Sequence, residues 1–173
     1  HEPSRRQRQM CIRDSHTCAT AAPGGSGALY LAASNFAERG ESVLLRDRYW
    51  GPYTGFLRGC GLGISTYPLL PAVPNSATPL LDLERFEECL AELAREQSTV
   101  MTWLNDPAHN PTGLSLPPES RYALLNTFME SATRNEHTGH TLLIDAAYHL
   151  YADEPHGCCL LYTSDAADEK VRG

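Results

Sequence analysis

The chain has 173 residues, of which 20% are charged, and its formal net charge is −7. This acidic balance argues against nucleic acid or an anionic membrane surface as a partner bound through bulk charge. No apolar run reaches the roughly 18 residues of a membrane-spanning helix, so the sequence predicts no span.

The two ends of the chain differ from the rest in a way that points to their coding DNA. Arg5–Ser15 reads RRQRQMCIRDS and Cys159–Glu169 reads CLLYTSDAADE, and neither shows the periodicity of a helix or a strand. Codons can be written for the second segment whose reverse complement encodes RRQRQMCIRD. The two segments are therefore consistent with opposite strands of one DNA sequence, which we identify as a transposon-derived sequencing adapter.

On this interpretation residues 1–15 and 159–173 are artefacts and are not expected to contribute to the fold. Residues 16–158 are then an internal fragment of a longer gene, at most one domain in size. The alternative is a pair of unstructured tails, one basic and one acidic. Between residues 16 and 158 there are eight arginines, no lysine and 16 acidic residues, so the net charge of this part is −8.

The first predicted element is a helix over 29–39, with Gly40 as its C-cap. It follows a glycine-rich turn, Gly24–Gly27 (GGSG). Glycines let the backbone approach an anion closely, and the free N–H groups of a helix N-terminus point at it. Many glycine turns precede helices without binding anything, so both interpretations stay open. The apolar positions of this helix are Leu29, Ala32, Ala33 and Phe36.

A short buried strand is predicted over 42–45, followed by an aromatic loop that contains Trp50. A tryptophan just after a strand could stack on a flat heterocycle, or it could close the edge of the core. A short helix over 54–60, ended by Gly61, and a strand over 63–69 come next. The stretch 71–79 holds three prolines and is expected to be a surface loop.

Asp82 is expected to cap an amphipathic helix over 83–96, with Phe86, Leu90 and Leu93 on its buried face. The acidic residues of this helix are expected to form a solvated face. A strand over 99–104 follows, and then a turn over 105–113.

Pro117 and Pro118 mark the start of the next predicted helix, which continues over 119–133 with Tyr122, Leu125 and Met129 along its apolar face. After a polar loop over 135–139, the last strand is expected over 141–144. Strands that alternate with helices predict βαβ units and a largely parallel sheet. The expected fold class is therefore α/β.

Two motifs lie just past the ends of predicted strands. Asn110–Gly113 reads NPTG, and Asp145–Tyr148 reads DAAY. Because the carboxyl ends of parallel strands meet at one edge of a sheet, we expect the Asn, the Asp and the Tyr on the same rim. That rim is where ligands bind in open α/β sheets.

Four motifs, in this order and with suitable gaps, resemble the aspartate aminotransferase superfamily, the class I and II aminotransferases of fold-type I. They are Gly24-Gly25-Ser26-Gly27-Ala28, Tyr49-Trp50-Gly51, Asn110-Pro111-Thr112-Gly113 and Asp145-x-Ala147-Tyr148. The resemblance extends through nearly all of residues 16–158. It implies a three-layer α/β/α large domain with a mostly parallel sheet, incomplete here, and pyridoxal 5′-phosphate as the cofactor.

The resemblance gives the glycine-rich turn and the tryptophan roles in holding this cofactor. Gly24, Gly25 and Ser26 would bind the phosphate, and Trp50 would stack on the pyridine ring. The segment Asp106-Pro107-Ala108-His109 is similar to bacterial members that act on aspartate or aromatic amino acids.

The resemblance also gives roles to the two rim motifs. Asn110 and Tyr148 would hydrogen-bond the 3′-oxygen of the cofactor, and the Asn110–Pro111 bond is expected to be cis. Asp145 would pair with the pyridine nitrogen, because a carboxylate favours the protonated ring. A pyridinium withdraws electrons from the substrate's α-carbon. Taken alone, Asp145 could equally be a helix cap or an ion-pair partner.

Residues 16–158 lack one group that the resemblance requires. The family's catalytic lysine forms the Schiff base with the cofactor and then moves the proton, and it is expected downstream of the Asp145 motif. The chain's only lysine, Lys170, lies in the second tail. We therefore expect the chain as written to be unable to transaminate.

The full-length protein is expected to move an amino group between an aromatic or aspartate-like amino acid and a 2-oxo acid, as a homodimer. Aromatic, acidic and branched substrates all remain open. Cys18, Cys60, Cys89 and Cys158 have no metal-ligand spacing and no secretory context, so we expect reduced thiols, a cytoplasmic protein and no metal. Three histidines are expected to be structural: His109, His140 and His149.

Three rival interpretations remain at this stage. A lyase, decarboxylase or acyl-transferring enzyme could share the fold and the cofactor. A regulator could carry an aminotransferase-like domain that binds a ligand without catalysis. An unrelated nucleotide-binding Rossmann domain is disfavoured, because the GGSG turn follows no obvious strand and no G-x-G-x-x-G is present.

Overall fold

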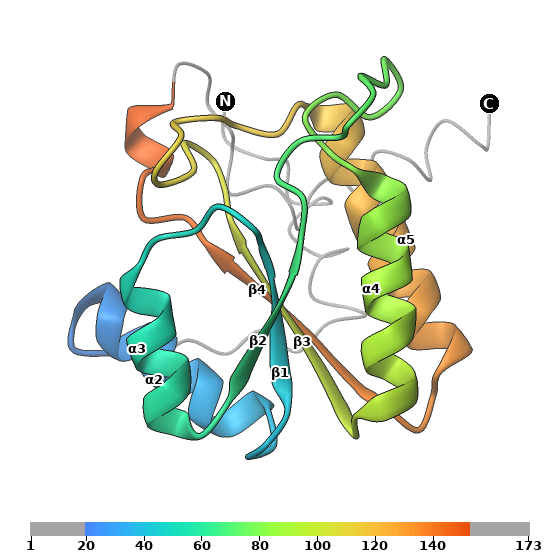
Figure 1. Ribbon diagram of the computed structural model, residues 1–173. Coiled ribbons are helices and arrows are strands. Elements are labelled where there is room, and N and C mark those ends of the chain that lie inside the picture. Colours follow the sequence, from blue (N-terminus) through green and yellow to red (C-terminus); the bar gives the residue numbers. More distant parts are fainter. Residues whose placement is uncertain (1–19, 153–173) are drawn as a thin grey trace, which may run out of the picture.

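The computed structural model describes residues 20–152, in which a four-stranded parallel sheet lies between helices (Figure 1). The expected limits of the native segment, at residues 16 and 158, lie outside this range. In chain order the elements are α2 (Gly24–Phe36), β1 (Ser42–Arg46), α3 (Pro52–Cys60), β2 (Gly63–Tyr67), α4 (Leu83–Glu96), β3 (Thr99–Asn105), α5 (Pro118–Arg134), β4 (Gly139–Asp145) and the short 3₁₀ helix η1 (His149–Tyr151).

The strand order in the sheet is β2-β1-β3-β4. The chain moves outward from β1 to β2 and then crosses back over β1 to form β3 on its other side. Loops that leave the carboxyl ends of β1 and β3 therefore diverge, which creates the crevice where open α/β sheets bind ligands. The long β3–β4 pairing runs from Thr99 opposite Gly139 to Asn105 opposite Asp145.

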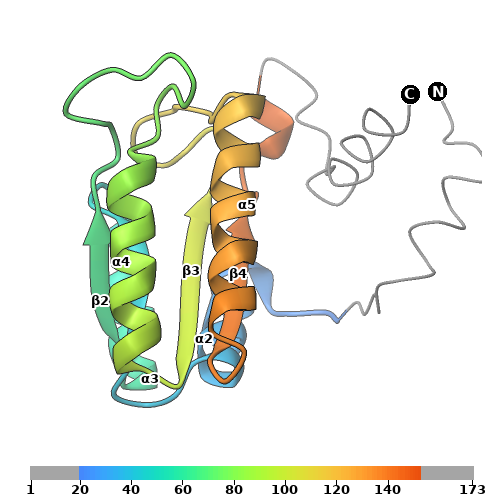
Figure 2. The same cartoon turned by 90° about the vertical axis from the view of Figure 1, so that its right-hand side faces the viewer.

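Helices cover both faces of the sheet, as expected for a three-layer α/β/α domain. Figures 1 and 2 show α2 and α3 on one side, and α4 and α5 packed side by side on the other. Alternate strand residues face opposite layers. Met101 and Trp103 pack with α2 and α3, whereas Val100 and Leu104 pack with α4 and α5. The expected α/β fold with a parallel sheet is confirmed.

Local sequence signals predicted the limits of helices α3 and α4 closely. Helix α4 has the predicted limits, and the Asp82 carboxylate accepts a hydrogen bond from the Arg85 backbone N–H at 3.2 Å. Helix α3 begins two residues before the prediction, because Pro52 suits the first turn of a helix. Gly61 ends it in the left-handed conformation, with φ of 76°.

Two expectations for helix α2 were wrong. The helix begins at Gly24, within the glycine-rich turn, and it ends at Phe36 rather than at Arg39. Gly40 is not its C-cap, since the cap position is Ala37 in an extended conformation. Gly40 instead adopts a φ of 93° in the turn before β1, a conformation that a residue with a Cβ rarely takes.

Helix α5 turns a different face to the core than predicted. Leu124 and Phe128 are buried, together with the small polar Thr127 and Ser131, whereas Met129 is 61% exposed. Strand β4 is also longer than expected and begins at Gly139, because the backbone pairing with β3 continues past the apolar stretch. Strand β2 is shorter and ends at Tyr67.

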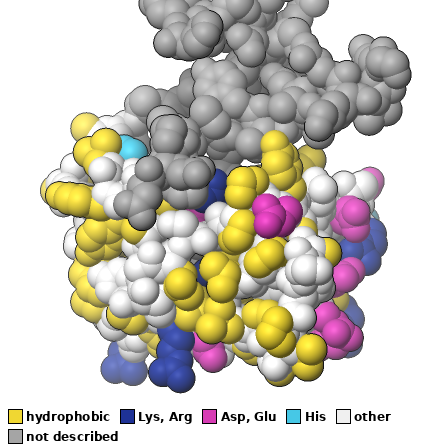
Figure 3. Space-filling model, turned by 90° about the horizontal axis from the view of Figure 1, so that it is seen from above, with side chains coloured by type: hydrophobic (Ala, Val, Ile, Leu, Met, Phe, Trp, Pro, Cys, Tyr) yellow, Lys and Arg dark blue, Asp and Glu magenta, His cyan; other side chains and the backbone are white. Residues whose placement is uncertain are grey.

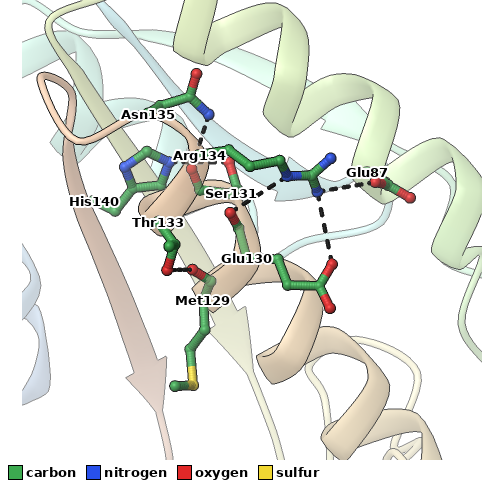
Figure 4. Close-up of polar contacts among 8 residues, drawn as sticks. All are labelled: Glu87, Met129, Glu130, Ser131, Thr133, Arg134, Asn135 and His140. Atoms are coloured by element: carbon green, nitrogen blue, oxygen red, sulfur yellow. Dashed lines mark hydrogen bonds and ion pairs between the residues drawn. The ribbon is translucent and has the colours of Figure 1, made fainter.

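Polar contacts at the end of α5 join it to α4 and β4 (Figure 4). The Arg134 guanidinium bonds Glu87 of α4 at 3.1 Å and lies 3.8 Å from Glu130. His140 of β4 lies 3.0 Å from the Ser131 hydroxyl and packs edge-on against Phe128. These contacts hold structural elements together, in line with the structural role expected for His140.

Seen from the carboxyl edge of the sheet, acidic side chains and arginines gather along the right-hand side, over α4 and α5 (Figure 3). This distribution agrees with the solvated charged face expected for α4. Within residues 20–152 no helix combines the length and the apolar composition needed to cross a membrane.

Candidate active site

A pocket of about 190 Å³ opens at the carboxyl edge of the sheet, between the strand ends and the N-terminus of α2. Its position matches the crevice created where the chain reverses direction across the sheet. Segments that are far apart in sequence meet here. The lining residues are Gly25, Ser26, Leu29, Trp50, Tyr53, Asn105, Asn110, Asp145, Ala147 and Tyr148.

The first turn of α2 forms one wall of this pocket. Gly24 has a φ of 71°, which lets the chain enter the helix from Pro23. A Cβ at Gly27 would lie 2.6 Å from the Pro23 ring, so the tight entry requires a glycine there. The first backbone N–H groups of a helix have no partner within it, and with the helix dipole they attract an anion. Gly25 and Ser26 present this turn to the pocket.

Asp145, the last residue of β4, forms the opposite wall. Its Oδ2 accepts a hydrogen bond from the Tyr53 hydroxyl at 2.5 Å, and its Oδ1 accepts one from the Ala147 backbone N–H at 3.1 Å. Burial, this hydrogen bond and the negative charge of Asp145 raise the pKa of Tyr53 far above its usual range. The phenol therefore stays protonated and acts as a fixed donor to the carboxylate.

Asn110 and Tyr148 meet across the pocket, although 38 residues separate them. The Asn110 Nδ2 lies 3.2 Å from the Tyr148 hydroxyl. The Asn110–Pro111 peptide is cis, as expected, and so is Asp106–Pro107. An amide donor and a phenol side by side can both bond one oxygen atom of a ligand.

Hydrogen bonds and an ion pair of buried side chains hold the loop that carries Asn110 in place. Asp106 is buried, accepts a hydrogen bond from the Leu116 backbone N–H at 2.8 Å, and forms an ion pair with Arg121 of α5 at 2.8 Å. His109 is also buried, and its Nδ1 lies 2.8 Å from the Thr112 hydroxyl. Burial, followed by the charge of Arg46, lowers the pKa of His109. The lowered pKa favours the neutral imidazole, and the contact with Thr112 agrees with the structural role expected for His109.

Trp50 provides an aromatic surface on the pocket wall. Its ring packs edge-on against Tyr53, with centroids 5.7 Å apart, and is tilted against Phe56 at 5.9 Å. The Tyr53 ring is held in turn by Trp103 at 5.0 Å. Two aromatic side chains, Tyr53 and Phe56, therefore fix the position of the Trp50 ring, which suits stacking against a flat ligand.

The sequence matches the profile of the family described as "Aminotransferase class I and II" over residues 11–165. The chain belongs to this family. An aromatic-amino-acid aminotransferase of Pseudomonas aeruginosa is 36% identical over 100 residues, which is 57% of this chain and 23% of that protein. A tyrosine aminotransferase of Rhizobium meliloti is 30% identical over 138 residues, covering 79% of this chain and 32% of that protein. The chain thus spans between a fifth and a third of the length of these relatives.

Solved aminotransferase structures share the fold. The crystal structure of an aminotransferase from Anaerococcus prevotii superposes with a TM-score of 0.64 and 24% identity, over 71% of this chain and 29% of that chain. The aspartate aminotransferase from Saccharomyces cerevisiae cytoplasm gives a TM-score of 0.53 and 24% identity, over 70% and 26%. At these identities the likeness concerns the fold alone.

Six of the seven predicted site residues line one pocket in this member of the family. Gly24 is the exception: it is the first residue of α2, and its backbone conformation leads the chain into the helix ahead of the lining residues Gly25 and Ser26. Residues 20–152 contain no group of three or more metal-ligating side chains close enough to hold an ion.

Two residues that bring polar side chains to the pocket were not predicted from the sequence, Tyr53 and Asn105. Tyr53 follows Trp50 by three residues, so both lie near one end of α3 and can face the same space. Asn105 is the polar residue that ends the apolar run of β3, at the register position of Asp145. A search for polar residues at strand ends would have found Asn105, but the partner of Tyr53 depends on the tertiary fold.

Proposed function

We propose that this chain is part of a pyridoxal-phosphate-dependent aminotransferase, which moves an amino group between an aromatic or aspartate-like amino acid and a 2-oxo acid. The observation that carries the proposal is the convergence of four motifs on one pocket at the carboxyl edge. Class I and II aminotransferases depend on pyridoxal 5′-phosphate, and the donor set of this pocket fits each part of that molecule.

The fit follows from the chemistry of the lining groups. The N-terminus of α2, with Gly25 and Ser26, would hold the phosphate. Trp50 would stack on the pyridine ring. Asn110 and Tyr148 would bond the 3′-oxygen, and Asp145 would face the ring nitrogen. When bound, the cofactor supplies an electron sink for the substrate's α-carbon.

The protein's own contribution begins with the Asp145 carboxylate. Tyr53 and the Ala147 N–H hold its two oxygens, and because Tyr53 remains protonated, it donates to the carboxylate without competing for a proton. A carboxylate held in this position would favour a proton on the ring nitrogen of the ligand. Asn110 and Tyr148, meeting at 3.2 Å, would fix the rotation of the ring about its stacking axis.

The remaining assignments extend beyond the described residues. We propose that residues 16–158 are a partial cofactor-binding large domain, and that residues 1–15 and 159–173 are translated adapter sequence, on the complementarity of their codons. Lys170, the only lysine, would then belong to the adapter. The chain as written would show no transamination, and the full-length protein would act as a cytoplasmic homodimer. Coding DNA that runs without adapter codons through both ends would contradict the adapter assignment.

Binding of a cofactor analogue tests the proposed function. Pyridoxamine 5′-phosphate is the suitable probe, because it has no aldehyde to react with Lys170 or the amino terminus. We expect saturable binding in equilibrium dialysis and quenching of the fluorescence of Trp50, one of two tryptophans in the chain. The matched control is Trp50→Phe, which should lose most of the quenching while binding is still measurable by dialysis. Absence of saturable binding, or equal binding of a dinucleotide, would contradict the proposal.

A further inference from the structure

Asn105 is a buried polar side chain at a position where the core favours an apolar one. It ends β3 directly after Trp103 and Leu104, and it is 6% exposed. Burial of an amide without partners destabilises a protein, whereas a leucine at this position would extend the apolar run. The hydrogen bonds of the Asn105 amide therefore have to account for a polar residue at this position.

The amide of Asn105 bonds the backbone of both rim motifs. Its Oδ1 accepts a hydrogen bond from the Asn110 N–H at 2.6 Å, and its Nδ2 donates to the Asp145 carbonyl at 2.8 Å. One rigid planar group thus spans the NPTG turn and the end of β4. The side chains of Asn110 and Asp145 both line the pocket.

The backbone pairing of β3 with β4 does not by itself fix the position of Asn110 relative to Asp145. The Asp106 N–H also donates to the Asp145 carbonyl, at 3.2 Å, so the pairing of β3 with β4 has a backbone bond of its own here. The turn that carries Asn110 lies beyond the ladder. Within the described residues, the Asn105 amide bonds the backbone of both motifs, whereas Asn110 and Tyr148 meet through their side chains.

We propose that Asn105 is a positioning residue that sets the distance between Asn110 and Asp145. In the proposed complex, the distance between Asn110 and Asp145 would match the distance between two parts of the ligand. These are the ring substituent that Asn110 bonds and the ring nitrogen that Asp145 faces. Asn105 would thereby select flat heterocycles that carry an acceptor oxygen at the matching distance from a basic nitrogen. The identity of the ligand rests on the proposed function, but the bridging role does not.

A ligand-free measurement separates the two claims. Amide hydrogen exchange, followed by NMR, should show the Asn110 N–H protected in the wild type and roughly tenfold less protected in Asn105→Leu. Asn105→Asp keeps the acceptor for Asn110 but loses the donor to Asp145, so it should preserve most of that protection. Equal protection of the Asn110 N–H in the wild type and Asn105→Leu would overturn the proposal, whether or not a cofactor binds.

A pair of ligands tests the consequence for binding. Asn105→Leu should weaken pyridoxamine 5′-phosphate roughly tenfold, and inorganic phosphate, which needs only the α2 N-terminus, by less than about twofold. A variant that is simply less well folded would weaken both ligands alike, and that result would overturn the positioning role. Gln97→Leu is the matched control, since Gln97 also bridges two strands through its amide but lies at the opposite edge of the sheet. It should leave the ratio of the two affinities unchanged.

A double-mutant cycle tests whether Asn105 acts through Asn110. In an Asn110→Ala background, Asn105→Leu should cost clearly less affinity for pyridoxamine 5′-phosphate than in the wild type, because one of the two side chains that Asn105 positions is then absent. Fully additive effects would overturn the proposal. If the wild type fails to bind pyridoxamine 5′-phosphate while Asn110 protection still depends on Asn105, the proposed function fails and the bridge stands.

Discussion

The two edges of the sheet use the same kinds of side chain for different purposes. At the amino edge the Glu41 carboxylate accepts hydrogen bonds from the backbone and hydroxyl groups of Ser98 and Thr99 and from the Glu38 N–H. At the carboxyl edge the Asp145 carboxylate accepts two from residues 20–152, one from Tyr53 and one from Ala147. A carboxylate offers about four lone-pair sites, so Glu41 is saturated while Asp145 is oriented but retains capacity.

The amides of the two edges repeat this contrast. Gln97 at the amino edge bonds Ser42 and Thr99 and serves the sheet alone. Asn105 at the carboxyl edge bonds the backbone of two residues whose side chains line the pocket. A ligand site in this fold is thus recognised by polar groups that the protein holds without saturating them. Matched substitutions at the two edges test that distinction.

The largest effect is expected for Asp145→Asn, which removes the charge facing the ring nitrogen. Charge-assisted hydrogen bonds contribute about 1.5–3 kcal/mol, so the affinity for pyridoxamine 5′-phosphate should fall by about 10- to 100-fold. Equilibrium dialysis measures this change, with Glu41→Gln as the matched carboxylate control. Equal losses of affinity in Asp145→Asn and Glu41→Gln would contradict the proposed difference between the two edges.

Glu41→Gln should show the converse pattern. It removes acceptors that serve several donors at the start of β3, so the free energy of unfolding in urea should fall by about 1–2 kcal/mol. Affinity for pyridoxamine 5′-phosphate should stay within about twofold of the wild type. A Glu41→Gln variant with unchanged stability would show that the hydrogen bonds to the Glu41 carboxylate contribute little to the free energy of unfolding.

Tyr53→Phe should have a smaller effect on binding. The variant keeps the aromatic packing against Trp50 and Trp103 but leaves Asp145 with one donor fewer. We expect about a three- to tenfold loss of affinity for pyridoxamine 5′-phosphate, with little change in the quenching at saturation. A larger loss than in Asp145→Asn would mean that Tyr53 contacts the ligand itself.

The smallest effect is expected for the pH dependence of the stability that Glu41 contributes. Burial alone would raise the pKa of Glu41, but hydrogen bonds from Thr99 and Ser98 lower it below the ordinary 4.5. A lowered folded-state pKa stabilises the protein fully above pH 4.5, and the contribution is lost as pH falls through the folded value. The stability difference between wild type and Glu41→Gln should therefore shrink below pH 4.5. A difference that grows on acidification would contradict this assignment.

The fold was predictable where one local signal decided the outcome. Helix α4 has both an N-cap, Asp82, and a regular apolar stripe, so its limits agree with the sequence. Helix α5 does not follow the apolar pattern, because the small residues Thr127 and Ser131 let it approach the sheet on the face they occupy. The first turn of α2 was missed because glycine has low helix propensity, and the tertiary context overrides it.

The candidate site was predictable to the extent that motifs mark it. Asp145, Asn110 and Tyr148 stand in recognisable motifs at strand ends, and the structure brings them to one pocket. Tyr53 and Asn105 act through contacts 92 and 40 residues away in the chain. Such contacts follow from strand register and helix placement, which a single sequence does not specify.

A crystal structure of the chain with pyridoxamine 5′-phosphate is the decisive test of the proposed cofactor site. We expect the phosphate at the first turn of α2, the ring beside Trp50, and the ring nitrogen within hydrogen-bonding distance of the Asp145 carboxylate. A ligand bound elsewhere, or a ring nitrogen turned away from Asp145, would contradict the claim that this unsaturated edge is the cofactor site.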